Sequence, residues 1–189
     1  MTECFNILAG LPAHGPLPVP YPSDGKGAFR EGLVVQFWDE NNKSWIANIQ
    51  RSFGTLDKVL SHPNQHDVII VAGGWAFAVD PSTKAIKADY GEGLTFVELL
   101  PEYGAALFVY PDHIETWRAD NRWWKTPRIS WDGIRHVQIG GGWLTAEAYS
   151  PIDNSWTAFE VDILTGSCTG SIYEAQIAKA IKIVPTPRK

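Results

Sequence analysis

The sequence has few cysteines and no long apolar run. Cys4 and Cys168 are its two cysteines among 189 residues, whereas small secreted domains usually carry dense cysteine frameworks. We therefore expect reduced thiols in a cytoplasmic compartment, although a Cys4–Cys168 bridge stays open. Nowhere do about 18 apolar residues follow one another, so a membrane-spanning helix is not expected. Residues 1–10 lack the cationic start and apolar run of a signal peptide.

Catalytic and cofactor motifs are missing as well. Neither Gly-x-Ser-x-Gly nor His-Glu-x-x-His occurs, and the run Gly140-Gly141-Gly142 is followed by no Lys-Ser/Thr pair that would mark a phosphate-binding loop. The formal charge is −5 and the pI about 5.5, and the densest basic stretch is the C-terminal tail. Nucleic-acid binding requires clustered Lys and Arg. The sequence therefore predicts no catalytic residue, no cofactor, no nucleic-acid partner and no membrane partner.

Possible metal ligands are present but incomplete. His62 and His66 lie four residues apart in a polar turn, and neither Cys nor Glu completes a zinc site there. Residues 39–43 resemble a calcium-binding loop but lack its glycine and its distal glutamate. We interpret both segments as turns and predict no metal. Whether His62, His113 and His136 converge depends on the fold.

The composition is otherwise that of a globular protein, with 44% hydrophobic and 12% aromatic residues. Residues 1–32 form a Pro/Gly-rich lead, which we expect to pack on the domain. Prolines at every second position from 16 to 22 oppose helix and central strand and are typical of polyproline II. We expect Leu17, Val19 and Tyr21 to pack inward. The alternative is a ligand for an aromatic-lined groove.

Residues 33–172 predict an all-β domain, because β-branched and aromatic runs alternate there with turn residues. The expected strands are 32–38, 44–49, 68–71, 75–79, 85–88, 94–100, 105–110, 114–118, 123–129, 135–139, 143–149, 155–161 and 167–172. Helical spacing occurs only near residues 173–183, so residues 173–189 are expected to be a short helix and tail.

Glycines indicate a period of about 40 residues. Gly54, Gly93 and Gly133 each follow an expected strand and precede the next group of strands, at spacings of 39 and 40. Gly74-Trp75 and Gly142-Trp143 are expected to occupy the same place, between the first and second strands of a group. Repeats of about 40–45 residues with four strands each are typical of β-propeller blades.

A second match is a turn of the form Asp-x-x-Thr, found at Asp80–Lys84 and at Asp162–Gly166. The expected strands place these two turns at different strand junctions, so this match supports the period less strongly.

Two segments, Gly73–Lys84 and Trp131-Asp132-Gly133, resemble blades of the WD40, Kelch and quinoprotein β-propellers. The resemblance covers roughly residues 33–172 and implies antiparallel meanders in a small or partial propeller. A β-sandwich is the alternative, because about 140 residues make three and a half blades and closed propellers have about four to eight. Through Arg30-Glu31-Gly32, His62-Pro63 and Trp156–Asp162 the chain is also similar to uncharacterised bacterial single-domain proteins.

Nine tryptophans are the strongest compositional feature. Buried indoles need packing partners and an acceptor for the N–H. We expect Trp75 and Trp143 to pack between sheets, and Trp38 and Trp45 to pair across a hairpin turn.

The candidate binding residues are Trp117, Arg122, Trp123 and Trp124. Trp123 and Trp124 are adjacent on an expected strand and must face opposite sides, so one is in the core. The other, beside Trp117, Arg122 and Lys125, would form a stacking surface. The alternative is that the Pro-rich lead covers it.

Three functions remain. The first is a non-enzymatic module that binds a protein partner through this Trp-rich face, as a bacterial scaffold or toxin-neutralising component. The second is a lectin-like module in which tryptophans stack on a glycan. The third is a hydrolase or lyase with carboxylates at the sheet ends, drawn from Glu98, Glu102, Glu115, Glu147 and Glu160.

Overall fold

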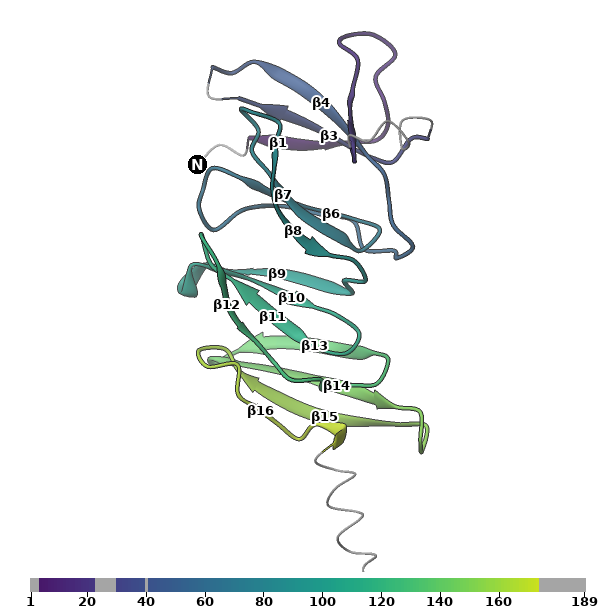
Figure 1. Cartoon of the computed structure of the whole chain (residues 1–189), viewed down its shortest axis with the longest axis vertical. Coiled ribbons are helices and arrows are strands. Elements are labelled where there is room, and N and C mark those ends of the chain that lie inside the picture. The colour runs from purple at the N-terminus through teal and green to yellow at the C-terminus, as the bar shows by residue number, and fades with distance from the viewer. Residues whose placement is uncertain (1–3, 23–29, 40, 174–189) are drawn as a thin grey trace, which may run out of the picture. The chain divides into compact units, whose positions relative to one another are not determined.

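The computed structural model describes residues 4–22, 30–39 and 41–173. The all-β prediction is confirmed: the strands form four four-stranded sheets (Figure 1). A single 3-10 turn, Pro101–Tyr103, accompanies the strands in this part of the chain. No helix here is long and apolar enough to cross a membrane. The helix and tail expected from residue 173 lie, apart from Tyr173, outside the described residues.

The first sheet has the order β1-β3-β4-β2. Its strands are β1 Phe5–Leu8, β2 Val19–Tyr21, β3 Leu33–Trp38 and β4 Ser44–Ile49. Strand β3 pairs antiparallel with both β1 and β4. Strand β2 runs parallel to β4, which departs from the expected antiparallel meanders. Pro20 lies in β2, at the edge of the sheet, where a missing N–H breaks no ladder.

The second sheet has its strands in sequence order: β5 Lys58–Ser61, β6 Val68–Ala72, β7 Trp75–Val79 and β8 Ile86–Gly91. All five residues of β6 are buried, in agreement with its wholly apolar sequence. The sequence did not predict β5.

The remaining two sheets are also meanders in sequence order. The third consists of β9 Phe96–Leu100, β10 Ala105–Val109, β11 Ile114–Trp117 and β12 Arg122–Lys125. The fourth consists of β13 Ile134–Gly140, β14 Trp143–Ser150, β15 Ser155–Asp162 and β16 Cys168–Thr169.

The glycine spacing marks the junctions between sheets. Gly54, Gly93 and Gly133 each lie between the last strand of one sheet and the first strand of the next. The predicted positions of the strands within the second sheet were wrong, however, because β5, its first strand, was missed. Gly74-Trp75 joins the second and third strands of its sheet, whereas Gly142-Trp143 joins the first and second.

The two Asp-x-x-Thr turns do occupy the same junction, contrary to the prediction. Each joins the third and fourth strands of its sheet. In each, an aspartate carboxylate accepts backbone N–H bonds from the two residues before the end of the turn. Lys84 and Gly166 then take left-handed φ values of 63° and 72°, so the two turns close alike.

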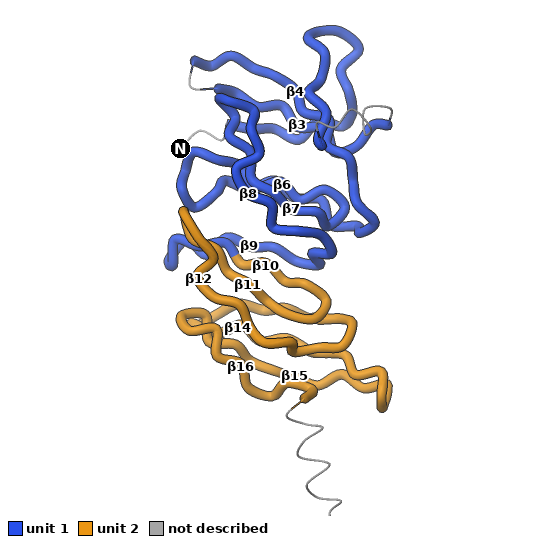
Figure 2. The backbone as a smooth tube through the Cα atoms, in the orientation of Figure 1, with its two compact units in different colours: residues 1–106 blue, residues 107–189 orange. Residues whose placement is uncertain are grey.

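Figure 2 shows two compact units, residues 1–106 and 107–189. In the first, the facing sides of the first two sheets form one apolar cluster that includes Tyr21, Phe37, Trp45 and Phe77. Polar ends of these rings are satisfied: the Trp45 Nε1–H donates to the Pro81 carbonyl oxygen at 2.8 Å. The expected domain boundaries at residues 32 and 172 stay predictions.

Several packing expectations need correction. Leu17 is 92% exposed, although Tyr21 of the same lead is buried. Trp45 lies opposite Phe37 and stacks on it, with ring centroids 4.7 Å apart, and does not pair with Trp38. Trp143 is 44% exposed, so it does not pack between sheets. Trp75, in contrast, packs against the core. The two tryptophans differ because they follow different strand junctions.

Candidate binding site

A buried carboxylate, Glu115, lies at the centre of a polar cluster on β11 and β12. Its side chain is only 8% exposed. Side chains two apart along extended chain share a face, so His113, Glu115 and Trp117 project to one side. The strand register then places Lys125 opposite Glu115 and Arg122 opposite Trp117. One hairpin therefore brings all five side chains together.

The Glu115 carboxylate is held from several directions. Lys125 Nζ lies 2.9 Å from Oε1 and His113 Nε2 lies 3.2 Å from the same oxygen. The Trp117 Nε1–H donates to Oε2 at 3.1 Å, and the Arg122 guanidinium is 3.6 Å from Oε1. Glu115 therefore fixes the orientation of both Trp117 and Arg122.

These contacts set the protonation of Glu115. Burial alone would raise the pKa of Glu115, because it removes the charged form from water. Hydrogen bonds from His113, Lys125 and Trp117, with the charge of Lys125, outweigh burial and lower that pKa to about 2. Glu115 is consequently ionised at neutral pH.

His113 lies between two carboxylates. Its Nδ1 is 2.6 Å from Asp112 Oδ1, and its Nε2 faces Glu115. The Tyr110 ring stacks on the imidazole with ring centroids 4.4 Å apart and planes 10° from parallel. The imidazole is thus fixed by stacking as well as by its two polar contacts.

Two arginine–tryptophan contacts extend the cluster to the surface. The guanidinium carbon of Arg118 lies 3.6 Å from the Trp123 ring centroid, and that of Arg122 lies 6.0 Å from the Trp117 centroid. Both distances fall within the range of cation–π attraction. Arg118, Arg122 and Lys125 are exposed, and the two indoles are half-buried. We call Trp117, Arg118, Arg122, Trp123 and Lys125 the Arg/Trp surface.

Of the four residues proposed from sequence, Trp117 and Arg122 lie opposite each other across the hairpin. Trp123 stacks with Arg118, the residue that follows Trp117 in the chain. Trp124 does not belong to the surface, because it is 9% exposed and donates its Nε1–H to the Ile163 carbonyl oxygen. Trp124 is therefore the core member of the adjacent pair and Trp123 the outward member. Sequence reasoning did not single out Arg118, or Glu115 as the organiser. The spacing His113-x-Glu115-x-Trp117 could have indicated this role, because residues two apart on a strand project to the same face.

The cluster is poorly suited to acid–base chemistry. A general acid needs a pKa near the working pH, whereas the pKa of Glu115 is lowered far below it. His113 and His136 do not share a carboxylate: His113 contacts Glu115, and His136 contacts Glu147. Within the described residues, no group of three or more His, Cys, Asp or Glu side chains is placed to hold a metal ion.

A smaller cluster of the same kind lies on the fourth sheet. Arg135 stacks 3.9 Å from the Trp156 centroid and its Nε–H donates to Glu147 Oε2 at 2.7 Å. His136 also contacts Glu147, from a left-handed φ of 55° at an irregularity in the β13–β14 register. The hydrogen bond from Arg135 is the main cause that lowers the pKa of Glu147.

Cys4 and Cys168 are both thiols in the structure. The bridge that the sequence left open is therefore not formed.

Comparison with known proteins gives little functional information. No family model matches the chain. An uncharacterised protein of Schizosaccharomyces pombe is 33% identical over 104 residues, which are 51% of this chain and 20% of that protein. The chain thus spans about a fifth of the length of that curated relative. The bacterial origin expected from the sequence stays a prediction, since this relative is from yeast.

One solved structure, a crystal structure of a eukaryotic initiation factor, aligns with 76% of this chain and 40% of its own chain. The sequence identity is 14% and the TM-score 0.42. A likeness at this level carries no argument about function.

Proposed function

We propose that the chain is a non-enzymatic binding module that holds a protein partner through the Arg/Trp surface. The observation that carries this proposal is the Arg118 guanidinium stacked 3.6 Å from the Trp123 centroid, beside Trp117 and Arg122, which Glu115 fixes from below. Tryptophan and arginine dominate the energetics of protein interfaces. Side chains already ordered before binding lose little conformational entropy when a partner arrives.

The charge of this surface favours an acidic partner. The Arg/Trp surface contains three cationic side chains, Arg118, Arg122 and Lys125, and the segment between its two strands contains one acidic side chain, Asp120, in a chain of net charge −5. The nearest carboxylate, Glu115, is buried and already paired. Complementary charge raises association rates and makes them sensitive to salt. The partner is proposed to be cytoplasmic, because two cysteines among 189 residues are too few for the dense disulfide framework of a small secreted domain.

A glycan fits the same surface less well. Sugar rings stack on an open indole face, but Arg118 occupies one face of Trp123. An acidic protein surface, in contrast, can contact the guanidinium and the ring edge together. A flat tryptophan-fluorescence response across a glycan panel is therefore expected, and quenching by one glycan would favour the lectin-like alternative.

The test is affinity capture with the tagged full-length chain in lysate of the cells that naturally express it. We expect one partner at near 1:1 stoichiometry from the wild type, and at least tenfold less from the variant carrying Arg118→Ala and Trp123→Ala. Trp143→Ala is the matched control, because Trp143 is 44% exposed but lies on another sheet. Absence of a stoichiometric partner, or equal loss with the control, would overturn the proposal.

A further inference from the structure

Strand β1, Phe5–Leu8, lies at an edge of the first sheet and lacks the protections that are usual at such an edge. An edge strand exposes backbone N–H and C=O groups, and proteins limit pairing there with charged side chains, proline, bulges or very short strands. Strand β1 contains neither a charged residue nor proline, and its register with β3 is continuous along its whole length. It is therefore open to pairing with a further strand.

The other edge strands of the four described sheets each carry at least one of these protections. Strand β2 contains proline, β16 has two residues, and β5, β8, β9, β12 and β13 contain charged side chains. Register shifts also interrupt the pairing of β8, β12 and β13 with their neighbours. The contrast is clearest within the first sheet, because Pro20 removes an N–H from the edge opposite β1. The open edge is thus a particular property of β1.

The hydrogen bonds between β1 and β3 fix which backbone groups face outward. The Trp38 N–H donates to the Cys4 carbonyl oxygen at 2.9 Å, so the backbone groups of Cys4 point toward β3. Along an antiparallel strand this direction alternates from one residue to the next. The N–H and C=O groups of Phe5 and Ile7 consequently point away from β3, toward the side on which the described sheet has no further strand.

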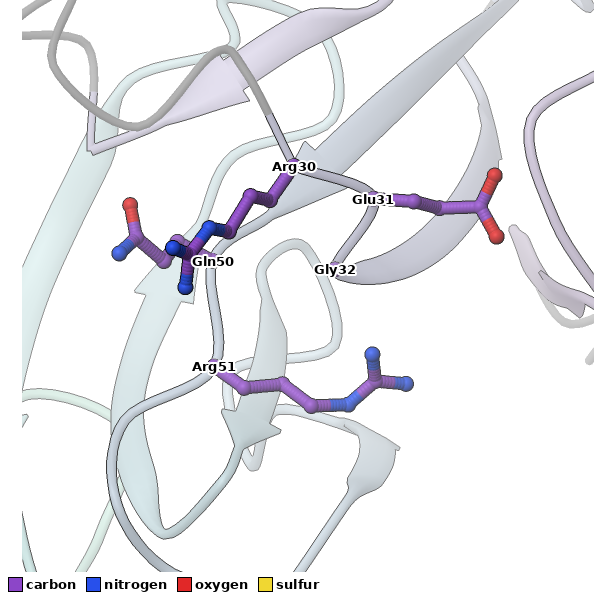
Figure 3. Close-up of a pocket in the computed structure, with 5 residues that line it drawn as sticks. All are labelled: Arg30, Glu31, Gly32, Gln50 and Arg51. Atoms are coloured by element: carbon purple, nitrogen blue, oxygen red, sulfur yellow. The ribbon is translucent and has the colours of Figure 1, made fainter.

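The chain is held on both sides of this strand. Before β1, the Cys4 carbonyl oxygen accepts the Trp38 N–H, and after it the Leu11 N–H donates to the Glu31 carboxylate at 3.1 Å. The Glu31 side chain extends away from that of Arg30, its neighbour at the same pocket (Figure 3). An edge that is ordered before it pairs loses less conformational entropy on association.

The side chains of β1 place an apolar surface at this edge. Phe5 and Ile7 share one face of the strand and lie opposite Phe37 and Val35 of β3, both of which are fully buried. Phe5 packs against the apolar cluster of the first unit. Ile7, in contrast, is 48% exposed, so a strand added beyond β1 would cover it.

We propose that β1 pairs antiparallel with β1 of a second copy of this chain, which joins the two first sheets into one. The two-fold axis passes beside Asn6. Phe5 of each copy then lies opposite Ile7 of the other, and each such pair exchanges two N–H···O bonds, with Cα atoms about 5.5 Å apart. The interface belongs to residues 1–106 and uses no residue of the Arg/Trp surface.

The strand itself favours a second copy as the occupant. Its outward backbone groups lie at Phe5 and Ile7, which match each other under a two-fold axis. Both facing side chains are apolar, and aromatic side chains paired across strands with β-branched ones are stabilising. No charged side chain lies on β1, so the two copies bring no like charges together there. An axis beside Ile7 would instead use Ala9, which lies outside the strand.

Sedimentation velocity of the purified full-length chain over a range of concentrations tests the proposal. We expect a species of twice the monomer mass of 21.0 kDa, and no larger species, because a two-fold interface closes. Ile7→Lys places a charge on the open edge and should weaken the association constant about tenfold or more. The backbone groups of Ile7 do not bond to β3, so the fold should persist, and circular dichroism checks this.

The matched control is Ile86→Lys. Ile86 is 42% exposed and lies on β8, an edge strand that already carries charged side chains, so its replacement should leave the association constant unchanged. A chain that stays monomeric overturns the proposal, and this includes the case in which β1 pairs only with a segment of a different protein. Open-ended aggregates, an association unaffected by Ile7→Lys, or equal weakening by Ile86→Lys also overturn it.

A cysteine at the axis tests the register. Asn6 residues of the two copies would form a non-hydrogen-bonded pair with Cα atoms about 4.5 Å apart, a separation that a disulfide can span. Mild oxidation of Asn6→Cys should therefore give a disulfide-linked dimer. The wild type, whose Cys4 would lie opposite Leu8 of the second copy, and Leu17→Cys, at a position 92% exposed, should give none. Equal crosslinking in either control contradicts the proposed pairing.

Discussion

The indole Nε1–H of Trp124 donates a 2.8 Å hydrogen bond to the carbonyl oxygen of Ile163, which is 39 residues later in the chain. This bond links β12 to the turn between β15 and β16. Gly166 of the same turn lies against the indole, because a Cβ there would be only 2.7 Å from Trp124 Cδ2. The turn and the ring are therefore fitted to each other, and the packing of the second unit depends on a glycine at position 166.

Gly166→Ala is expected to lower the free energy of unfolding by about 2–5 kcal/mol. A left-handed backbone costs a non-glycine residue about 1–2 kcal/mol, and overpacking against the indole adds about 1–3 kcal/mol. Gly141→Ala is the matched control: its φ is 59°, but no atom lies within 4 Å of the added Cβ. Urea denaturation should show a clearly smaller loss for Gly141→Ala, and equal losses would contradict the role assigned to Trp124.

The Asp162 turn can be tested by separating its hydrogen bonds from its charge. Asp162 Oδ1 accepts the N–H groups of Leu164 and Thr165 at 2.8 and 3.0 Å. Asp162→Ala leaves both N–H groups without this acceptor and should cost about 1–2 kcal/mol. Asp162→Asn keeps an acceptor oxygen and should cost less than about 0.5 kcal/mol by the same reasoning. Denaturation midpoints measure both, and an Asn variant as unstable as the Ala variant would show that the charge matters instead.

The sequence predicted the hairpins with strong local signals. β3 and β4 are correct because Asp39 begins their turn, and its carboxylate accepts the N–H groups of Asn41 and Lys43. The short strand β5 was missed because Lys58–Ser61 has only two apolar residues and no flanking hairpin signal. Its ladder depends on pairing with the apolar strand β6, which is a tertiary effect. Because β5 was omitted, the later strands of its sheet were numbered one too low. The equivalent turns at Asp80 and Asp162 were therefore assigned to different strand junctions.

The candidate site was predicted in part for a similar reason. Strand alternation alone separates Trp123 from Trp124, but it does not say which of them is buried. The Ile163 carbonyl oxygen that accepts the Trp124 N–H comes from another sheet. Glu115 was considered from the sequence only as one of five possible catalytic carboxylates. Its role in the binding site was missed, because its burial becomes favourable only with Lys125 directly opposite. Such pairing across strands cannot be read from one strand's sequence.

Glu115 should make stability depend on pH in the acid range. Its pKa in the folded state is about 2, below the ordinary 4.5, so the unfolded chain takes up the proton first as pH falls. The stabilisation is therefore complete above pH 4.5 and is lost as pH falls toward about 2. Glu115→Gln should be less stable at pH 7 by about 1–3 kcal/mol and should lose less on acidification. Urea denaturation of both proteins between pH 7 and pH 2 measures this.

A surface ion pair provides the control for that measurement. Glu98 pairs with Lys58 at 2.9 Å, but its side chain is 45% exposed, and exposed pairs contribute little to stability. Glu98→Gln should therefore reproduce the wild-type loss of stability below pH 4.5. If Glu115→Gln lost stability as steeply as Glu98→Gln, the low pKa of Glu115 would not be a determinant of acid unfolding.

His62 should act in the opposite protonation state, as a buried neutral imidazole. The Asn64 N–H donates to its Nδ1 at 3.1 Å, so the ring proton lies on Nε2, which is 3.0 Å from the Tyr90 hydroxyl. Burial lowers the pKa of His62 below 6.5 and outweighs the contributions of Asn64 and Asp67, which raise it. Because the unfolded chain then binds the proton first, stability is full above pH 6.5 and falls as pH drops below it.

Replacement of His62 by asparagine removes the titrating group and should flatten the pH dependence between pH 7.5 and 5.5, at some cost in stability at pH 7.5. His136→Asn is the matched control, because the side chain of His136 is 67% exposed and its replacement should keep the wild-type slope. Guanidinium denaturation at several pH values over this range compares the three proteins. If His62→Asn kept the wild-type dependence of stability on pH, His62 would be protonated as readily in the folded chain as in the unfolded one. The contact with Tyr90 would then not require a neutral ring.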